Sequence, residues 1–139
     1  QAGTAAAAPA TLTLRPRFAP DPTVQPGTAG GTKAAAELAP NCSGWVSEAP
    51  NHVVTLPRRI RQMSILVNAD GADTTLVVQQ PNGSFVCNDD VDTNELNPGV
   101  RQAFAPGDYK IWVGSYNQGA RPSYRLGFTQ ARNVSSASI

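Results

Sequence analysis

The stretch from residue 73 to residue 114 constrains the fold of this chain more than any other part of the sequence. It contains strand-like segments at 74–80, at 84–87 and from 109 onward, separated by turns rich in Pro, Gly, Asn and Asp. Asn82-Gly83 is the strongest hairpin signal in the chain, because both residues tolerate the positive φ angles of a type I′ turn. We therefore predict that the first two segments are antiparallel neighbours joined by this turn.

Strand-like segments also occur outside this stretch, at 11–15, 44–47, 52–56, 62–68, 100–105 and 123–129. Most of them place β-branched or aromatic residues at alternate positions, which is the period of a half-buried strand. The twelve Gly and twelve Pro residues also favour a turn-rich β protein. Short strands at regular intervals predict an all-β fold, an antiparallel two-sheet β-sandwich of the jelly-roll type.

The length of 139 residues predicts a single folded domain with flanking segments. Residues 1–10 are small and uncharged, so we expect a flexible tail there, with donation as a strand to a neighbour as a further role. The sandwich is predicted to span residues 11–130, and residues 131–139 are predicted to form a C-terminal tail. Four prolines between residues 16 and 26 predict irregular backbone early in the domain.

The charge and hydropathy of the chain exclude several classes of partner. Eleven basic and ten acidic residues nearly cancel, so we predict no nucleic-acid partner. No apolar run approaches the roughly 20 residues that cross a bilayer, so we predict no membrane span. The sequence starts at Gln1 followed by small residues. We expect such a start after removal of an export signal, although a trimmed fragment would look the same.

Cys42 and Cys87 form an even cysteine count, which suits one disulfide in an oxidising compartment. The alternative is a pair of buried free thiols. A metal site at these cysteines is disfavoured, because the chain has no CxxC pair and His52 is its one histidine. We therefore expect an exported protein that is periplasmic, at the cell surface or extracellular.

The acidic loop at residues 88–95 is the strongest candidate for a metal site. Asp89, Asp90 and Asp92 could offer several oxygen ligands to calcium, and Asp73 could add another if the hairpin brings it close. Asn and Asp residues also stabilise turns through bonds from their side chains to the backbone. Both readings, bound calcium and structural turn, follow from the same residues.

The sequence offers little for catalysis and somewhat more for binding. His52 could act as a general base, but no activated nucleophile accompanies it, so we predict that the chain is not an enzyme. Trp112 and Tyr116 share one face of their predicted strand, opposite Tyr109. We expect these two rings to form an exposed binding face for protein or glycan.

With these residues in view, the chain resembles the bacterial pre-peptidase C-terminal domain superfamily, a group of secreted jelly-roll sandwiches, in its stand-alone exported form with two cysteines. The resemblance covers about residues 40–130. It rests on six motifs: Cys42-Ser43-Gly44, Asp73-Thr74-Thr75-Leu76, Pro81-Asn82-Gly83, Cys87-Asn88-Asp89-Asp90, Asn97-Pro98 and Gly107-Asp108-Tyr109-Lys110-Ile111-Trp112-Val113-Gly114.

The resemblance implies a domain that serves export, targeting or substrate binding beside secreted hydrolases, and related collagen-binding domains bind calcium. Those relatives take part of their calcium ligands from an acidic N-terminal linker, whereas residues 1–20 here contain no acid. Our leading prediction is a non-catalytic exported sandwich that acts by protein contact, self-assembling or serving as an envelope or extracellular subunit. The alternative is a calcium-dependent accessory module that binds protein or glycan for a secreted hydrolase.

Overall fold

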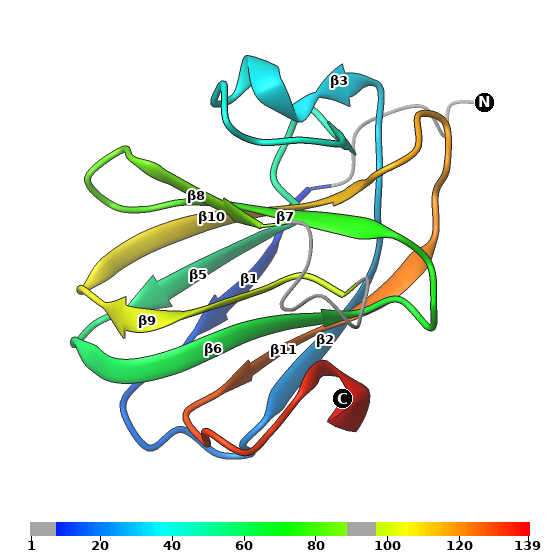
Figure 1. Ribbon diagram of the computed structural model, residues 1–139. Helices are drawn as coiled ribbons and strands as arrows, with labels where there is room; N and C mark the ends of the chain where they lie inside the picture. Colours follow the sequence, from blue (N-terminus) through cyan, green and yellow to red (C-terminus); the bar gives the residue numbers. More distant parts are fainter. Residues whose placement is uncertain (1–7, 89–96) are drawn as a thin grey trace.

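The computed structural model describes residues 8–88 and 97–139, and in these residues the chain forms two β-sheets packed face to face (Figure 1). The strands are β1 Ala10–Thr13, β2 Thr23–Thr28, β3 Lys33–Ala34, β4 Trp45–Val46, β5 His52–Leu56, β6 Ile60–Asn68, β7 Thr74–Gln79, β8 Phe85–Asn88, β9 Gly99–Phe104, β10 Gly107–Ser115 and β11 Ser123–Thr129. Two short 3₁₀ helices are also present, η2 at Ala35–Glu37 and η3 at Ser136–Ser138. The predicted all-β, two-sheet sandwich is confirmed.

The seven-stranded sheet is built around β10. On one side β10 pairs with β7, which pairs with β8; on the other side it pairs with β5 and, at Ser115, with β4. β3 extends the sheet beyond β4, and β1 extends it beyond β5. The β1–β5 pairing is parallel, so the prediction of purely antiparallel strands is wrong there. Parallel neighbours need a long connection, and the chain between β1 and β5 supplies it with β2, β3 and β4.

The four-stranded sheet has the order β2-β11-β6-β9. β6 lies inside this sheet, as its crowded apolar residues predict. The prediction of irregular backbone around the early prolines is wrong for Thr23–Thr28, which pairs with β11 as β2. β2 is an edge strand, and Pro26 is tolerated there because an edge residue can leave its nitrogen facing away from the sheet.

The main core lies between the two sheets and takes alternate residues from their strands. On β10, Tyr109, Ile111 and Val113 point into this core and are at most 2% exposed, as their alternation predicts. Lys110 and Trp112 therefore point to the outer face of the seven-stranded sheet. This outer face holds the residues considered below.

The hairpin between β7 and β8 pairs Val78 with Val86, which confirms the predicted neighbours. The predicted type I′ turn is wrong, because among the turn residues only Gly83 has a positive φ, at 91°. The Gly83 N–H donates to the Gln80 carbonyl at 2.8 Å, closing a loop that contains Pro81. The two central residues of this turn are Pro81 and Asn82. Type I′ requires a positive φ at both central residues, whereas proline fixes φ near −65°. The residue with left-handed backbone is therefore Gly83, directly after them.

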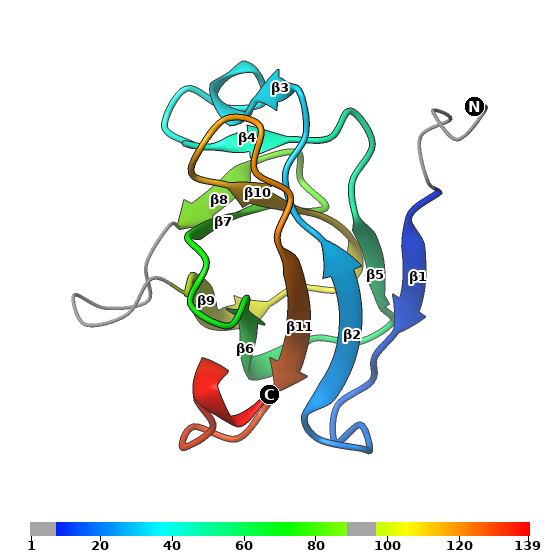
Figure 2. The same ribbon diagram turned by 90° about the vertical axis from the view of Figure 1, so that its right-hand side faces the viewer.

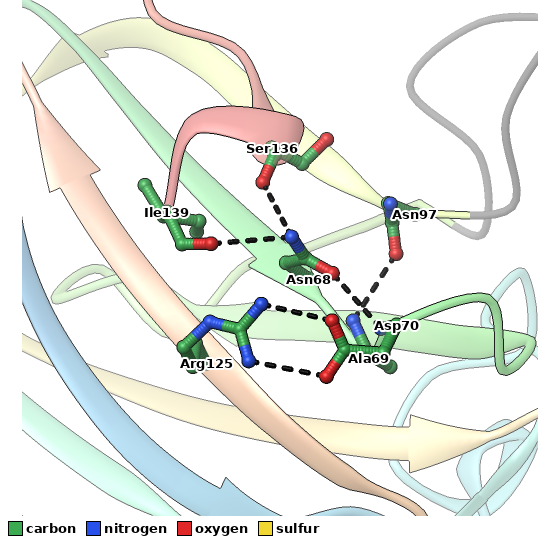
Figure 3. A network of polar contacts seen from close by, with 7 residues as sticks. All are labelled: Asn68, Ala69, Asp70, Asn97, Arg125, Ser136 and Ile139. Carbon is green, nitrogen blue, oxygen red and sulfur yellow. Dashed lines mark hydrogen bonds and ion pairs between the residues drawn. The ribbon is translucent and has the colours of Figure 1, made fainter.

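The C-terminal segment packs against the four-stranded sheet and does not form the predicted tail. Asn68 Nδ2 donates to the carbonyls of Ser136 and Ile139, at 2.9 and 3.2 Å (Figure 3). Ser136 is buried, and the Ile139 side chain occupies space that a Cβ at Gly127 would need. The packed domain therefore extends to Ile139. Asn68 of β6 supplies hydrogen bonds to two carbonyls of the C-terminal segment that would otherwise face solvent.

The turn after β6, at Ala69 and Asp70, contacts Asn97 and Arg125 of β11. The Ala69 N–H donates to Asn97 Oδ1, and the Asp70 N–H donates to Asn68 Oδ1 (Figure 3). Arg125 donates two hydrogen bonds to the Asp70 carboxylate, at 3.0 and 3.1 Å, and these bonds lower the pKa of Asp70. Asp70 is thus engaged in a structural ion pair.

In the described part of the chain, no helix is long and apolar enough to cross a membrane.

Candidate interaction site

The outer face of the seven-stranded sheet carries a second, smaller core. The segment around η2 folds over this face (Figure 1). Cys42 of that segment is bonded to Cys87 of β8, with their Cα atoms 5.5 Å apart. The predicted disulfide is therefore confirmed. Ala35 and Val46 pack here against the outward side chain of Val77. The disulfide fastens this outer layer to the sheet.

Trp112 belongs to the outer layer, and the prediction that it lies on an exposed binding face is wrong. Its side chain is 4% exposed and packs beside Phe85, with ring centroids 6.3 Å apart. The strand parity was correctly predicted, but the outer layer of residues 35–46 covers that face. Tyr116 lies just beyond β10 and is 52% exposed, so it is accessible without Trp112 beside it.

The predicted metal ligands are only partly within the described structure. Asp89, Asp90 and Asp92 lie outside the described residues. Asp73 precedes β7, and the pairing of Leu76 with Asn88 places the start of β7 and the end of β8 at the same end of the hairpin. Within residues 8–88 and 97–139, no three His, Cys, Asp or Glu side chains gather as a metal site.

His52 is a core residue that links the two sheets. It is 1% exposed; its Nε2 lies 2.7 Å from the Tyr124 hydroxyl on β11, and its Nδ1 lies 2.9 Å from Gln25 Oε1 on β2. Each ring nitrogen faces one partner, so the neutral ring donates a hydrogen bond through one nitrogen and accepts one through the other. Gly27 lies opposite Tyr124 and leaves room for that hydroxyl, since a Cβ there would overlap it.

The burial of His52 sets its chemistry. Desolvation disfavours the imidazolium form and lowers the pKa of His52 to about 4, and it raises the pKa of Tyr124. The two side chains hold a neutral hydrogen bond between the sheets. A general base must reach substrate, and a histidine enclosed in this way has no path to one.

The edges of the two sheets differ in how they are protected against pairing with another chain. Edge strands are usually blunted by charge, proline, bulges or short length. β2 contains Pro26; β9 carries Arg101 and pairs irregularly with β6; β3 has only two residues, one of them Lys33. β8 is held by the Cys87 disulfide and contacts β9.

β1 is short, at four residues, but it lacks the other protective features. Its sequence Ala-Thr-Leu-Thr contains no charge and no proline, and its register with β5 is regular. Thr11 and Thr13 are exposed, whereas Leu12 packs partly on the main core. Figure 2 shows β1 as the outermost strand beside β5. The open edge of β1, residues Ala10–Thr13, is therefore the candidate interaction site in the described part of the chain.

The sequence indicated a strand at this place but not its role. Alternating residues at 11–15 predict the strand, and the structure starts it at Ala10. Its position at an edge depends on which strands pair, and the parallel contact with β5 follows only from the assembled sheet. The sequence signal for an unprotected edge was the absence of charged side chains from residues 1–14.

Comparisons with known proteins support the fold. No protein-family model matches the chain, and no curated protein sequence matches it. Among solved structures, it is similar to the pre-peptidase C-terminal domain of a collagenase from Bacillus anthracis, with 15% identity and a TM-score of 0.52 over 90% of this chain and 100% of that chain. A periplasmic inhibitor of g-type lysozyme from Aeromonas hydrophila aligns with 15% identity and a TM-score of 0.42, over 88% of this chain and 98% of that chain.

The likeness to the collagenase domain shows a shared sandwich fold. It agrees with the fold that the sequence motifs predict. Membership of the pre-peptidase superfamily remains a prediction, because an identity of 15% does not reach beyond the fold.

Proposed function

We propose that this chain is an exported, non-catalytic β-sandwich protein that acts by protein contact at the open edge of β1. The unprotected edge is the observation that carries the proposal, because unpaired strand edges recruit extended segments of other chains. The Cys42–Cys87 disulfide supports export, since such bonds persist in oxidising compartments. The enclosure of His52 in the core supports a role without catalysis.

A peptide-binding experiment tests this proposal. We expect wild-type protein to bind a labelled, uncharged octapeptide of alternating Thr and Val, measured by fluorescence polarisation. Thr11→Lys puts a charged side chain, one of the devices that protect edge strands, on the β1 edge and should weaken binding about tenfold, or about 1.4 kcal/mol. Thr28→Lys places the same charge on exposed Thr28 at the β2 edge and should bind like wild type. No binding by wild type, or equal loss in both variants, would contradict the proposal.

A second candidate is a calcium-dependent accessory module that binds protein or glycan for a secreted hydrolase. A hollow of about 150 Å³ beside the disulfide favours it, because Asn41, Ser43 and Asn88 line this hollow at the end of β8. The chain continues from there into the acidic stretch of Asp89, Asp90 and Asp92. Carboxylate oxygens and the carbonyl oxygens of Asn side chains and backbone are ligands that calcium prefers.

Calcium binding to the native state should raise the melting temperature by mass action. We expect millimolar calcium to stabilise the wild type, and the double variant Asp89→Asn, Asp90→Asn to lose that shift. Magnesium at the same concentration controls for ionic strength. An unchanged melting temperature in wild-type protein would eliminate this second candidate.

A further inference from the structure

The backbone of β1 leaves four hydrogen-bonding groups directed away from β5. The Ala10 N–H donates to the Asn51 carbonyl at 3.1 Å, and the Leu14 N–H donates to the Thr55 carbonyl at 3.0 Å. Alternate residues of a strand direct their N–H and C=O to the same side, so Leu12 also faces β5. Thr11 and Thr13 therefore direct their N–H and C=O outward, and no other described residue hydrogen-bonds to these groups.

We propose that these groups pair with the same groups of a second copy, so that β1 of each copy lies antiparallel to β1 of the other. This inference rests on the proposed function and names the partner at that edge. The two seven-stranded sheets would join into one continuous sheet around a two-fold axis. Such an interface is isologous, with the same surface contributed by both copies.

The outward groups select the register of this pairing. With the axis at Leu12, Thr11 lies opposite Thr13 of the second copy and Thr13 opposite its Thr11. Residues opposite each other in a hydrogen-bonded antiparallel pair exchange both N–H···O bonds, so all four outward groups are satisfied in each copy. Pro9 would face Arg15 at the two ends, where its missing N–H costs one bond and interrupts nothing further.

The side chains are compatible with a second copy. Cross-strand Thr–Thr pairs are favourable, and the two Leu12 side chains meet across the axis. Residues 1–14 are uncharged, so identical edges meet without repulsion. The two Arg15 residues would lie about 20 Å apart along the strands, beyond the roughly 8 Å screening length at physiological salt.

The short edge limits the strength of the dimer. Four residues bury much less than the roughly 800 Å² per partner of a stable complex, so we expect a reversible dimer. Sedimentation equilibrium from about 10 µM to about 1 mM should show a concentration-dependent monomer–dimer transition in wild-type protein. Amide hydrogen exchange should show protection of Thr11 and Thr13 that increases with concentration.

Matched variants identify the edge used. Thr11→Pro removes an outward N–H without removing a bond to β5, so it should stay folded and monomeric, whereas Thr28→Lys should dimerise like wild type. Thr11→Lys, Thr13→Lys and Thr11→Glu, Thr13→Glu double variants should each be monomeric alone and form a heterodimer when mixed, because the register places residue 11 opposite residue 13. Deleting residues 1–7 should leave the dimer intact.

Three results would overturn the inference. A wild-type monomer throughout the concentration range would exclude the second copy as partner, while binding of the alternating Thr and Val peptide would leave the proposed function standing. A dimer in which Thr11 and Thr13 exchange freely would place the interface elsewhere. Loss of the dimer on deletion of residues 1–7 would assign it to strand donation by the N-terminal tail.

Discussion

His52 shows how a single side chain connects the two sheets of the sandwich. Its ring lies on β5, and its hydrogen bonds reach Tyr124 on β11 and Gln25 on β2. The edge-to-face contact of the His52 and Tyr124 rings adds to this link, with centroids 5.8 Å apart. A buried, hydrogen-bonded neutral imidazole fixes the spacing of the sheets here. Its burial lowers the stability of the fold when the pH falls.

The buried imidazole makes stability depend on pH. His52 has a pKa of 6.5 in the unfolded chain and about 4 in the fold. Between these values the unfolded chain binds a proton that the folded protein does not, so stability falls as the pH is lowered through this range, by about 3 kcal/mol in total. Urea unfolding of wild type and His52→Gln at pH 7 and pH 4.5 measures the difference. An identical loss in both proteins would contradict the assignment.

At the scale of elements, the outer layer decides which face of the seven-stranded sheet is accessible. η2 and the residues up to β4 cover Trp112 and Val77, and the Cys42–Cys87 bond joins this layer to β8. The side chain parity of β10 could be predicted from alternation alone. The covering segment could not, because its residues at 35–46 lie far in sequence from the strands they contact.

Breaking the disulfide should loosen the outer layer. The bond closes a loop with a sequence separation of 45, so the Cys42→Ser, Cys87→Ser variant should lose roughly 4 kcal/mol of stability. In a Trp45→Phe background, Trp112 should also become accessible to acrylamide quenching under native conditions. The Trp45→Phe protein with its disulfide intact is the control. Continued shielding of Trp112 in the serine variant would mean that apolar packing alone holds the layer.

At the scale of the whole molecule, the sandwich closes one side and leaves another open. β8 and β9 are in contact at one side, whereas β1 and β2 end the sheets at the other (Figure 2). β2 is protected by Pro26, and β1 has no such protection. Under the proposed function, this open side is where a strand of another chain would extend the sheet.

The sequence by itself determined most of the strands, with β2 and β3 as exceptions, together with the β7–β8 hairpin and the inward face of β10, because alternation and turn residues act over a few neighbouring positions. The cysteine pairing could also be predicted from the sequence, since two cysteines allow only one pair. The tertiary structure alone decided that Trp112 is covered, that His52 is enclosed, that residues 136–139 are docked and that β1 is an open edge. Each of these depends on contacts between segments far apart in the chain, and a local pattern carries no information about which distant segment will supply them.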